Sequence, residues 1–243
     1  DVIISGAGLP IDLPEYVKGA KTKIAPIVSS VKSAKVILKM WEKRYNRTAD
    51  FVVIEGPKAG GHLGFKKEDL ENQTYQSLEE IFQEVEQVVE SFQLNIPIFV
   101  AGGIHQRSDV KHFFELGVDG VQVASRFIPT YECDASMKYK EAFLKAKKEE
   151  VGLVSSPVGM PGRAFQNAFV QKTKQEKVPI KKCYQCLTPC NLKTTPYCIS
   201  RALIEAVKGN LDEGLIFTGA YGYMQDHLMH VEEVIHELME DEK

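Results

Sequence analysis

A histidine follows a run of glycines at the end of an apolar segment, and this combination could hold a ligand and move a proton. The stretch Glu55–Gly64 reads EGPKAGGHLG and directly follows the apolar residues that end at Glu55. Glycine lets a backbone approach a ligand closely, and an imidazole can act as acid or base near neutral pH. We therefore predict that His62 is catalytic and that Gly60 and Gly61 contact a bound cofactor. The alternative is a glycine-rich turn that carries a surface histidine.

Two further apolar segments end in residues that could hold a phosphate. Gly102 and Gly103 follow one of them, and Ala124 and Ser125 stand at the end of the next. Backbone N–H groups and hydroxyls are the donors that phosphate oxygens accept in such loops. We predict that these four residues bind a phosphate-bearing cofactor. The chain has neither a GxGxxG nor a GxxxxGK[ST] motif, which argues against a Rossmann or P-loop site.

Four of the five cysteines lie close together near residue 190, in the spacing C-x2-C-x3-C-x7-C. Thiolates so spaced could wrap a zinc ion or an iron–sulfur cluster. The predicted metal ligands are Cys183, Cys186, Cys190 and Cys198, in a structural role. Free buried thiols and disulfides are the alternatives.

The elements that would position these residues alternate between strand and helix. Apolar runs without polar alternation are typical of strands buried on both faces of a parallel sheet. Such runs lie at Val2–Ser5, Ile24–Ser29, Phe51–Glu55, Ile96–Ala101 and Gly120–Ala124. Helical spacing of apolar residues occurs in Val31–Lys43, Leu78–Phe92 and Ser108–Leu116. The pattern indicates βαβ units, in either an open doubly wound sheet or a barrel.

Composition and chain ends limit the possible classes of protein. The 243 residues carry a formal net charge of −3, with 44% hydrophobic and 26% charged residues. We expect no nucleic-acid or membrane partner, because no segment is strongly basic and no apolar run is long enough for a membrane span. No signal peptide is evident, so we expect a cytoplasmic protein. The chain begins at Asp1, directly before an apolar segment, and we expect further residues upstream.

The ordered motifs resemble one known family. EGPKAGGHLG, AGGI and QVASRF, with SGAGL at Ser5–Leu9 and PVGMPGRA at Pro157–Ala164, make the chain similar to the nitronate monooxygenase (2-nitropropane dioxygenase) family along its whole length. The resemblance implies an α/β fold, the (β/α)8 TIM barrel with FMN. Strands four to eight would be present here, in residues 1–130. Residues 131–243 would form a helical extension that packs on the barrel and contains the cysteine cluster.

The resemblance also implies roles for individual residues. His62 matches the catalytic histidine, and Gly61, Gly102, Gly103 and Ser125 match positions that bind the flavin phosphate. Many relatives have Gly-Thr where this chain has Ala124-Ser125, which retains the hydroxyl. A lysine that some relatives place after the fifth strand is absent here, so the electronic environment of the flavin would differ.

The implied activity is FMN-dependent oxidation of alkyl nitronates with O2. The flavin-type enoyl-ACP reductases share the barrel and the histidine, so NAD(P)H-dependent reduction of an enoyl thioester is the alternative enzyme. A flavin-binding or redox-sensing module without turnover is a third hypothesis. In each case the partner is a small molecule, and a homo-oligomer is compatible with the sequence.

Overall fold

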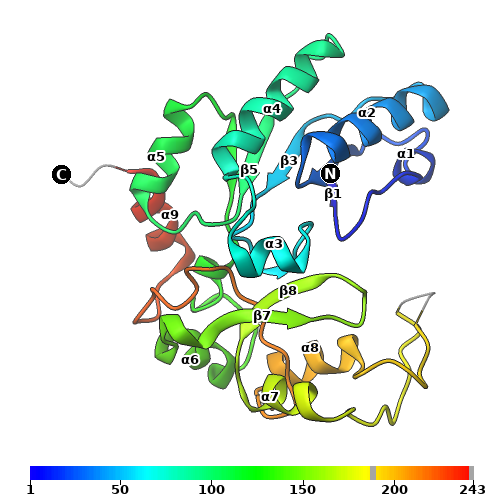
Figure 1. The fold of residues 1–243 in the computed structure, drawn as a ribbon. Helices are drawn as coiled ribbons and strands as arrows, with labels where there is room; N and C mark the ends of the chain where they lie inside the picture. The colour runs from blue at the N-terminus through cyan, green and yellow to red at the C-terminus, as the bar shows by residue number, and fades with distance from the viewer. Residues whose placement is uncertain (187–189, 241–243) are drawn as a thin grey trace. The chain divides into compact units, whose positions relative to one another are not determined.

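The computed structural model describes residues 1–186 and 190–240 of the chain (Figure 1). Contacts between Cα atoms divide these residues into two compact units. Unit 1 contains residues 1–57 and 64–123, and unit 2 contains residues 58–63 and 124–243. The EGPKAGGHLG motif therefore begins in unit 1, contributes its central residues to unit 2 and ends in unit 1.

Unit 1 is built on a five-stranded parallel sheet of order β1-β2-β3-β5-β6. The strands are β1 (Val2–Ser5), β2 (Lys23–Val28), β3 (Val52–Glu55), β5 (Ile98–Ala101) and β6 (Gly120–Gln122). All five predicted strands are present, with ends that differ by two residues at most. Parallel pairing of consecutive strands agrees with strands four to eight of a barrel, and the described residues do not contain a complete one. Val2, Ile3 and Ile4 of the edge strand are exposed.

The helices of unit 1 are α1 (Leu13–Tyr16), α2 (Val31–Tyr45), α3 (Lys67–Asn72), α4 (Leu78–Ser91) and α5 (Arg107–Glu115). Helix α4 begins with the capping box visible in the sequence: Ser77 Oγ accepts from the Glu80 N–H, and Glu80 accepts from the Ser77 N–H. One apolar stripe of α4 is buried, and α2 buries Trp41, whose indole N–H donates to the Pro10 carbonyl at 3.0 Å. Both helices thus cover the sheet because their apolar residues recur at helical spacing.

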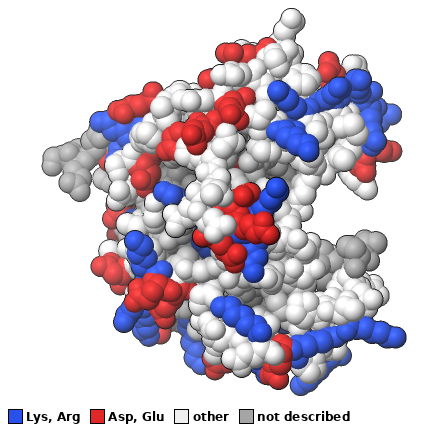
Figure 2. Space-filling model, viewed as in Figure 1, with Lys and Arg blue, Asp and Glu red and all other residues white. Residues whose placement is uncertain are grey.

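Charges on the outer surface of unit 1 are divided between two helices. Figure 2 shows acidic side chains gathered over α4 and basic side chains over α2. Since α2 and α4 pack against each other, the opposite charges lie on neighbouring elements. No described helix combines the length and the apolar composition that a bilayer crossing requires.

Unit 2 combines a small antiparallel sheet with helices. The sheet has the order β4-β8-β7, with β4 (Gly61–His62), β7 (Val151–Ser155) and β8 (Pro161–Phe165). The helical elements are η1 (Ser125–Phe127), α6 (Met137–Lys145), η2 (Lys148–Glu150), α7 (Ala168–Gln175), α8 (Ile199–Val207) and α9 (Val231–Met239). The sequence predicted helical structure in residues 131–243 but not the sheet. Its strands are short and contain glycine and proline, so they lack a clear apolar pattern.

Candidate active site

Strand β4 holds His62 within the sheet of unit 2. His62 pairs with Gly162 of β8, and Gly61 pairs with Arg163. The next residue, Leu63, is buried and donates its N–H to the Pro161 carbonyl at 2.8 Å. The backbone before and after His62 is therefore held against β8.

The His62 side chain is half-buried between a serine and an aromatic ring. Its Nε2 lies 2.7 Å from Ser156 Oγ, and its ring meets Phe217 edge-on at a centroid distance of 5.0 Å. Ser156 Oγ also accepts the Val158 N–H at 3.4 Å, and in the tautomer with the ring hydrogen on Nε2 the same oxygen accepts that hydrogen and leaves the Nδ1 lone pair free. Burial lowers the pKa of His62. The imidazole is therefore neutral near pH 7 and can accept a proton.

Gly60 lies in such close contact with another loop that no side chain would fit. A Cβ atom at this position would stand 2.5 Å from the Thr218 carbonyl carbon and 2.6 Å from the Gly219 nitrogen. The neighbouring Lys58 donates from Nζ to the Tyr221 hydroxyl at 2.8 Å. The glycine-rich segment is thus packed against residues 218–221, as close backbone approach requires.

Ser125 belongs to the same cluster in unit 2. It opens η1, directly after Ala124, and its Oγ accepts the Gly219 N–H at 2.9 Å. Because the oxygen acts there as an acceptor, its hydroxyl hydrogen is available to donate to a phosphate oxygen. Gly60 and Ser125, 65 positions apart in the sequence, therefore both contact Gly219.

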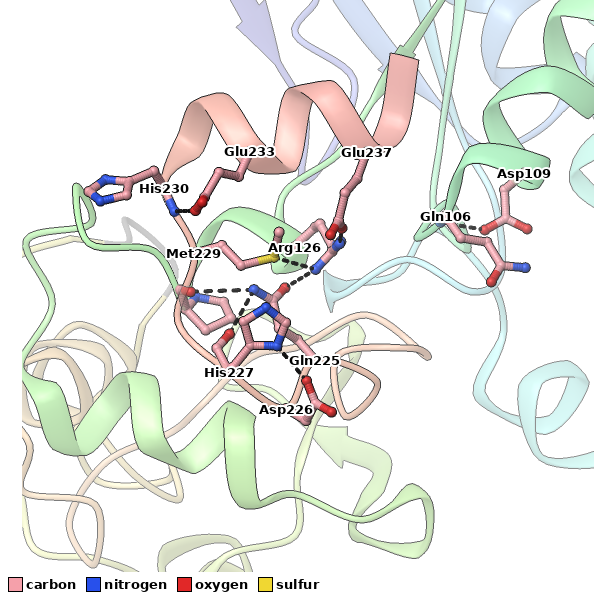
Figure 3. A network of polar contacts seen from close by, with 11 residues as sticks. Gln106, Asp109, Arg126, Gln225, Asp226, His227, Met229, His230, Glu233 and Glu237 are labelled. Atoms are coloured by element: carbon pink, nitrogen blue, oxygen red, sulfur yellow. Dashed lines mark hydrogen bonds and ion pairs between the residues drawn. The ribbon is translucent and has the colours of Figure 1, made fainter. Parts of the chain in front are cut away.

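Arg126 connects η1 to the C-terminal helix. Its guanidinium bonds to Gln225 and to Glu237 of α9, and its Nη1 lies 3.6 Å from the Met229 sulfur (Figure 3). The side chain is nine-tenths buried, and its Nε has no hydrogen-bond partner within residues 1–186 and 190–240. A buried guanidinium paired in this way holds the Ser125 turn to α9.

In unit 1, a glutamate and two glycines lie at the carboxyl ends of β3 and β5. Gly102 and Gly103 follow β5 with φ of 93° and 85°, a conformation that other residues rarely adopt. Glu55, the last residue of β3, pairs with Ala101 and so lies beside this glycine pair. Burial raises the pKa of Glu55 to about 7. Its carboxyl has no hydrogen-bond partner in the described part of the chain.

The structure gathers some of the predicted residues within one unit. Unit 2 holds His62, Gly60, Gly61, Ala124 and Ser125, whereas Gly102 and Gly103 lie in unit 1.

Sequence reasoning missed Ser156, Phe217 and the carboxyl group of Glu55. The only sequence signal for Ser156 was its position directly before the PVGMPGRA motif. Ser156 lies 94 positions from His62, so no local pattern could connect the two.

The cysteine cluster does not form a site for a single metal ion. Among the described residues, no group of three or more His, Cys, Asp or Glu side chains is placed to hold one. Cys183, Cys186, Cys190 and Cys198 are all free thiols, as is Cys133. The structure therefore gives no support to the predicted zinc ion or iron–sulfur cluster.

Comparisons with known proteins support the family resemblance that the order of the motifs indicated. Residues 1–241 match the family model of nitronate monooxygenase. A probable nitronate monooxygenase of Staphylococcus saprophyticus is 32% identical over 126 residues, which are 52% of this chain and 34% of the relative. Among solved structures, FabK from Thermotoga maritima is similar with a TM-score of 0.72 and 25% identity, over 98% of this chain and 66% of FabK.

A nitroalkane oxidase from Streptomyces ansochromogenes shares the fold. Its TM-score is 0.70 at 20% identity, over 98% of this chain and 62% of the oxidase. The matched region is thus about a third of the length of the staphylococcal relative, and this chain spans about two thirds of the two solved structures.

Proposed function

Since the chain belongs to the nitronate monooxygenase family, we propose that it acts in FMN-dependent oxidation of alkyl nitronates with O2. The observation that carries this proposal is the environment of His62, a neutral, half-buried imidazole held by Ser156 and placed next to the glycine-rich segment. Such a group suits a reaction that moves a proton at a carbon next to nitrogen.

The chain's own residues provide the proton chemistry. His62 accepts or positions the proton, and the lowered pKa keeps its imidazole unprotonated at neutral pH. Ser156 orients the ring through Nε2, which leaves Nδ1 for other partners. The edge of the Phe217 ring limits the movement of the imidazole and excludes water from one side of it.

The residues of the glycine-rich segments fit a flavin phosphate. Ser125 has a hydroxyl hydrogen to donate, and Gly61, Gly102 and Gly103 have left-handed φ values and no side chain to shield their backbone N–H groups. We assign these residues, with Gly60 and Ala124, to FMN binding. When bound, FMN would supply the electron transfer between substrate and O2.

Replacement of the histidine tests the proposal. We expect His62→Asn to retain the flavin, seen as bands near roughly 370 and 450 nm. It should lose turnover of neutral 2-nitropropane, whose α-proton must be removed to give the nitronate, by about 10²- to 10⁴-fold, measured as oxygen uptake. His236→Asn is the matched control, because His236 is exposed on α9 and pairs with Glu240. Full activity of His62→Asn with a normal flavin spectrum would exclude the assigned role.

Reduction of an enoyl thioester with NAD(P)H is the second candidate, favoured by the similarity to FabK over 98% of this chain. The two activities differ in their co-substrate. Oxidation of NADPH that depends on crotonyl thioester, without oxygen uptake on nitronate, would identify the reductase. A flavin spectrum without either activity would identify a flavin-binding module.

A further inference from the structure

The turn that contains Ser125 cannot hold its own position. Element η1 is a 3-10 helix of three residues. Within it, the Phe127 N–H donates to the Ala124 carbonyl at 2.9 Å, and the Ile128 N–H donates to the Ser125 carbonyl at 3.3 Å. A helical turn this short is unstable alone, because its few hydrogen bonds do not offset the order that they require. The direction of the Ser125 side chain therefore depends on contacts between η1 and the rest of unit 2.

Arg126, the central residue of η1, connects the turn to two other segments. Its side chain is nine-tenths buried, and it donates from Nη1 to Gln225 Oε1 and from Nη2 to Glu237 Oε2 (Figure 3). Glu237 lies on α9 and carries the opposite charge. Because a buried charge without a partner is strongly unfavourable, this ion pair holds η1 against α9.

Gln225 holds the chain on the other side of η1. Its side chain is buried, and Nε2 donates to the Pro129 carbonyl at 3.4 Å and to the His227 carbonyl at 3.2 Å. Pro129 follows η1 directly after Ile128. Arg126 thus bonds to an amide that is itself bonded to the residues after the turn, and η1 is held from both sides.

The position of η1 decides where the Ser125 hydroxyl can donate. Ser125 Oγ accepts the Gly219 N–H at 2.9 Å, and its own hydrogen remains available to a phosphate oxygen. A donor that is already fixed binds more tightly than a mobile one, since less freedom is lost on binding. Without the contacts of Arg126, Ser125 would keep its hydroxyl but lose its fixed position.

We propose that Arg126 is a positioning residue for the flavin phosphate, and that α9 supports phosphate binding through Glu237. The inference rests on the FMN binding assigned under the proposed function, and it does not depend on the substrate. Riboflavin lacks the phosphate and offers Ser125 no charged acceptor. The ratio of the affinities for FMN and riboflavin is therefore the quantity that this network controls.

Flavin titrations of the full-length protein, freed of bound flavin, test the proposal through the quenching of flavin fluorescence. Glu237→Ala removes the partner of the guanidinium at a half-exposed position of α9. We expect its Kd for FMN to rise by about three- to thirtyfold and its Kd for riboflavin to stay within about twofold of the wild type. Glu232→Ala is the matched control and should change neither value, because Glu232 is an exposed glutamate of the same helix.

Further variants link the effect to Ser125. Ser125→Ala should weaken FMN binding by about ten- to a hundredfold, with a much smaller change for riboflavin. Once the hydroxyl is gone, adding Glu237→Ala should leave the ratio of the two affinities nearly unchanged, because the group that it positions is absent. Arg126→Lys should resemble Glu237→Ala, since an ammonium group cannot replace the forked contacts of a guanidinium.

The outcomes separate this inference from the proposed function. A wild-type affinity ratio in both Glu237→Ala and Arg126→Lys would overturn the inference. An equal loss of affinity for both flavins would show a structural role alone and would also overturn it. A selective loss of FMN affinity supports the inference even in a protein that does not oxidise nitronates. A wild type that binds neither flavin would overturn both proposals.

Discussion

Glu55 provides a test in which the effect on stability depends strongly on pH. The carboxyl is largely buried at the end of β3, has no hydrogen-bond partner among the described residues, and has a pKa raised from 4.5 to about 7. In the unfolded chain the same group ionises near its ordinary pKa. Because the folded state binds this proton more tightly, stability falls as pH rises from about 4.5 to about 7.

The size of the effect follows from the two pKa values. Each pKa unit corresponds to about 1.4 kcal/mol, so the penalty from Glu55 grows by about 2.5 kcal/mol between about pH 5 and about pH 8. Glu55→Gln replaces the carboxyl with a neutral group of the same shape and removes this penalty. We expect the variant to gain about 2.5 kcal/mol relative to the wild type when the pH is raised over that range.

Urea unfolding of the wild type and the variant at both pH values measures the difference. Glu90→Gln is the control, because Glu90 is exposed on α4, and its effect should be the same at both pH values. A Glu55→Gln effect that does not change with pH would mean that the carboxyl is already ionised in the folded protein. In that case burial would not dominate the pKa of Glu55 in the folded protein.

Two further substitutions test local packing and electrostatics. Gly60→Ala should destabilise the protein by about 1–3 kcal/mol, because the new Cβ would meet backbone atoms at 2.5 Å; a melting curve unchanged from the wild type would contradict this packing. For Asp50, burial alone would raise the pKa, but hydrogen bonds from Lys23, the Ile24 N–H and Arg47 outweigh it and lower the pKa. Asp50→Asn should therefore cost stability at pH 7, and this cost should shrink as the pH falls below about 4. Unfolding at pH 7 and pH 3 would measure the change, and an equal cost at both values would argue against the ionic contribution.

The positions of the strands and of the main helices could be predicted from the sequence because they depend on local patterns. The run Val52–Glu55 is apolar at successive positions, and Ser77 with Glu80 forms a capping box within four residues. The motif around His62 also identified the histidine and its family. Each of these signals lies within about ten residues of chain, where spacing alone carries the information.

The sequence did not predict the small sheet of unit 2 or the partners of its histidine. Strand β8 contains Pro161 and Gly162, which weaken any strand pattern, and its pairing with β4 joins residues about a hundred positions apart. Likewise, the pattern of alternating strands and helices could not distinguish an open sheet from a barrel, because both place the same βαβ units side by side.

By itself, the sequence thus determined the family, the five parallel strands and the residue types available for chemistry, since these depend on local order along the chain. Only the tertiary structure decided that Ser156 orients His62, that Ser125 and Gly60 contact Gly219, and that Arg126 bonds to Gln225 and Glu237. The reason is physical. Long-range contacts form where packing and hydrogen bonding between distant segments are satisfied together, and no spacing within one segment encodes them.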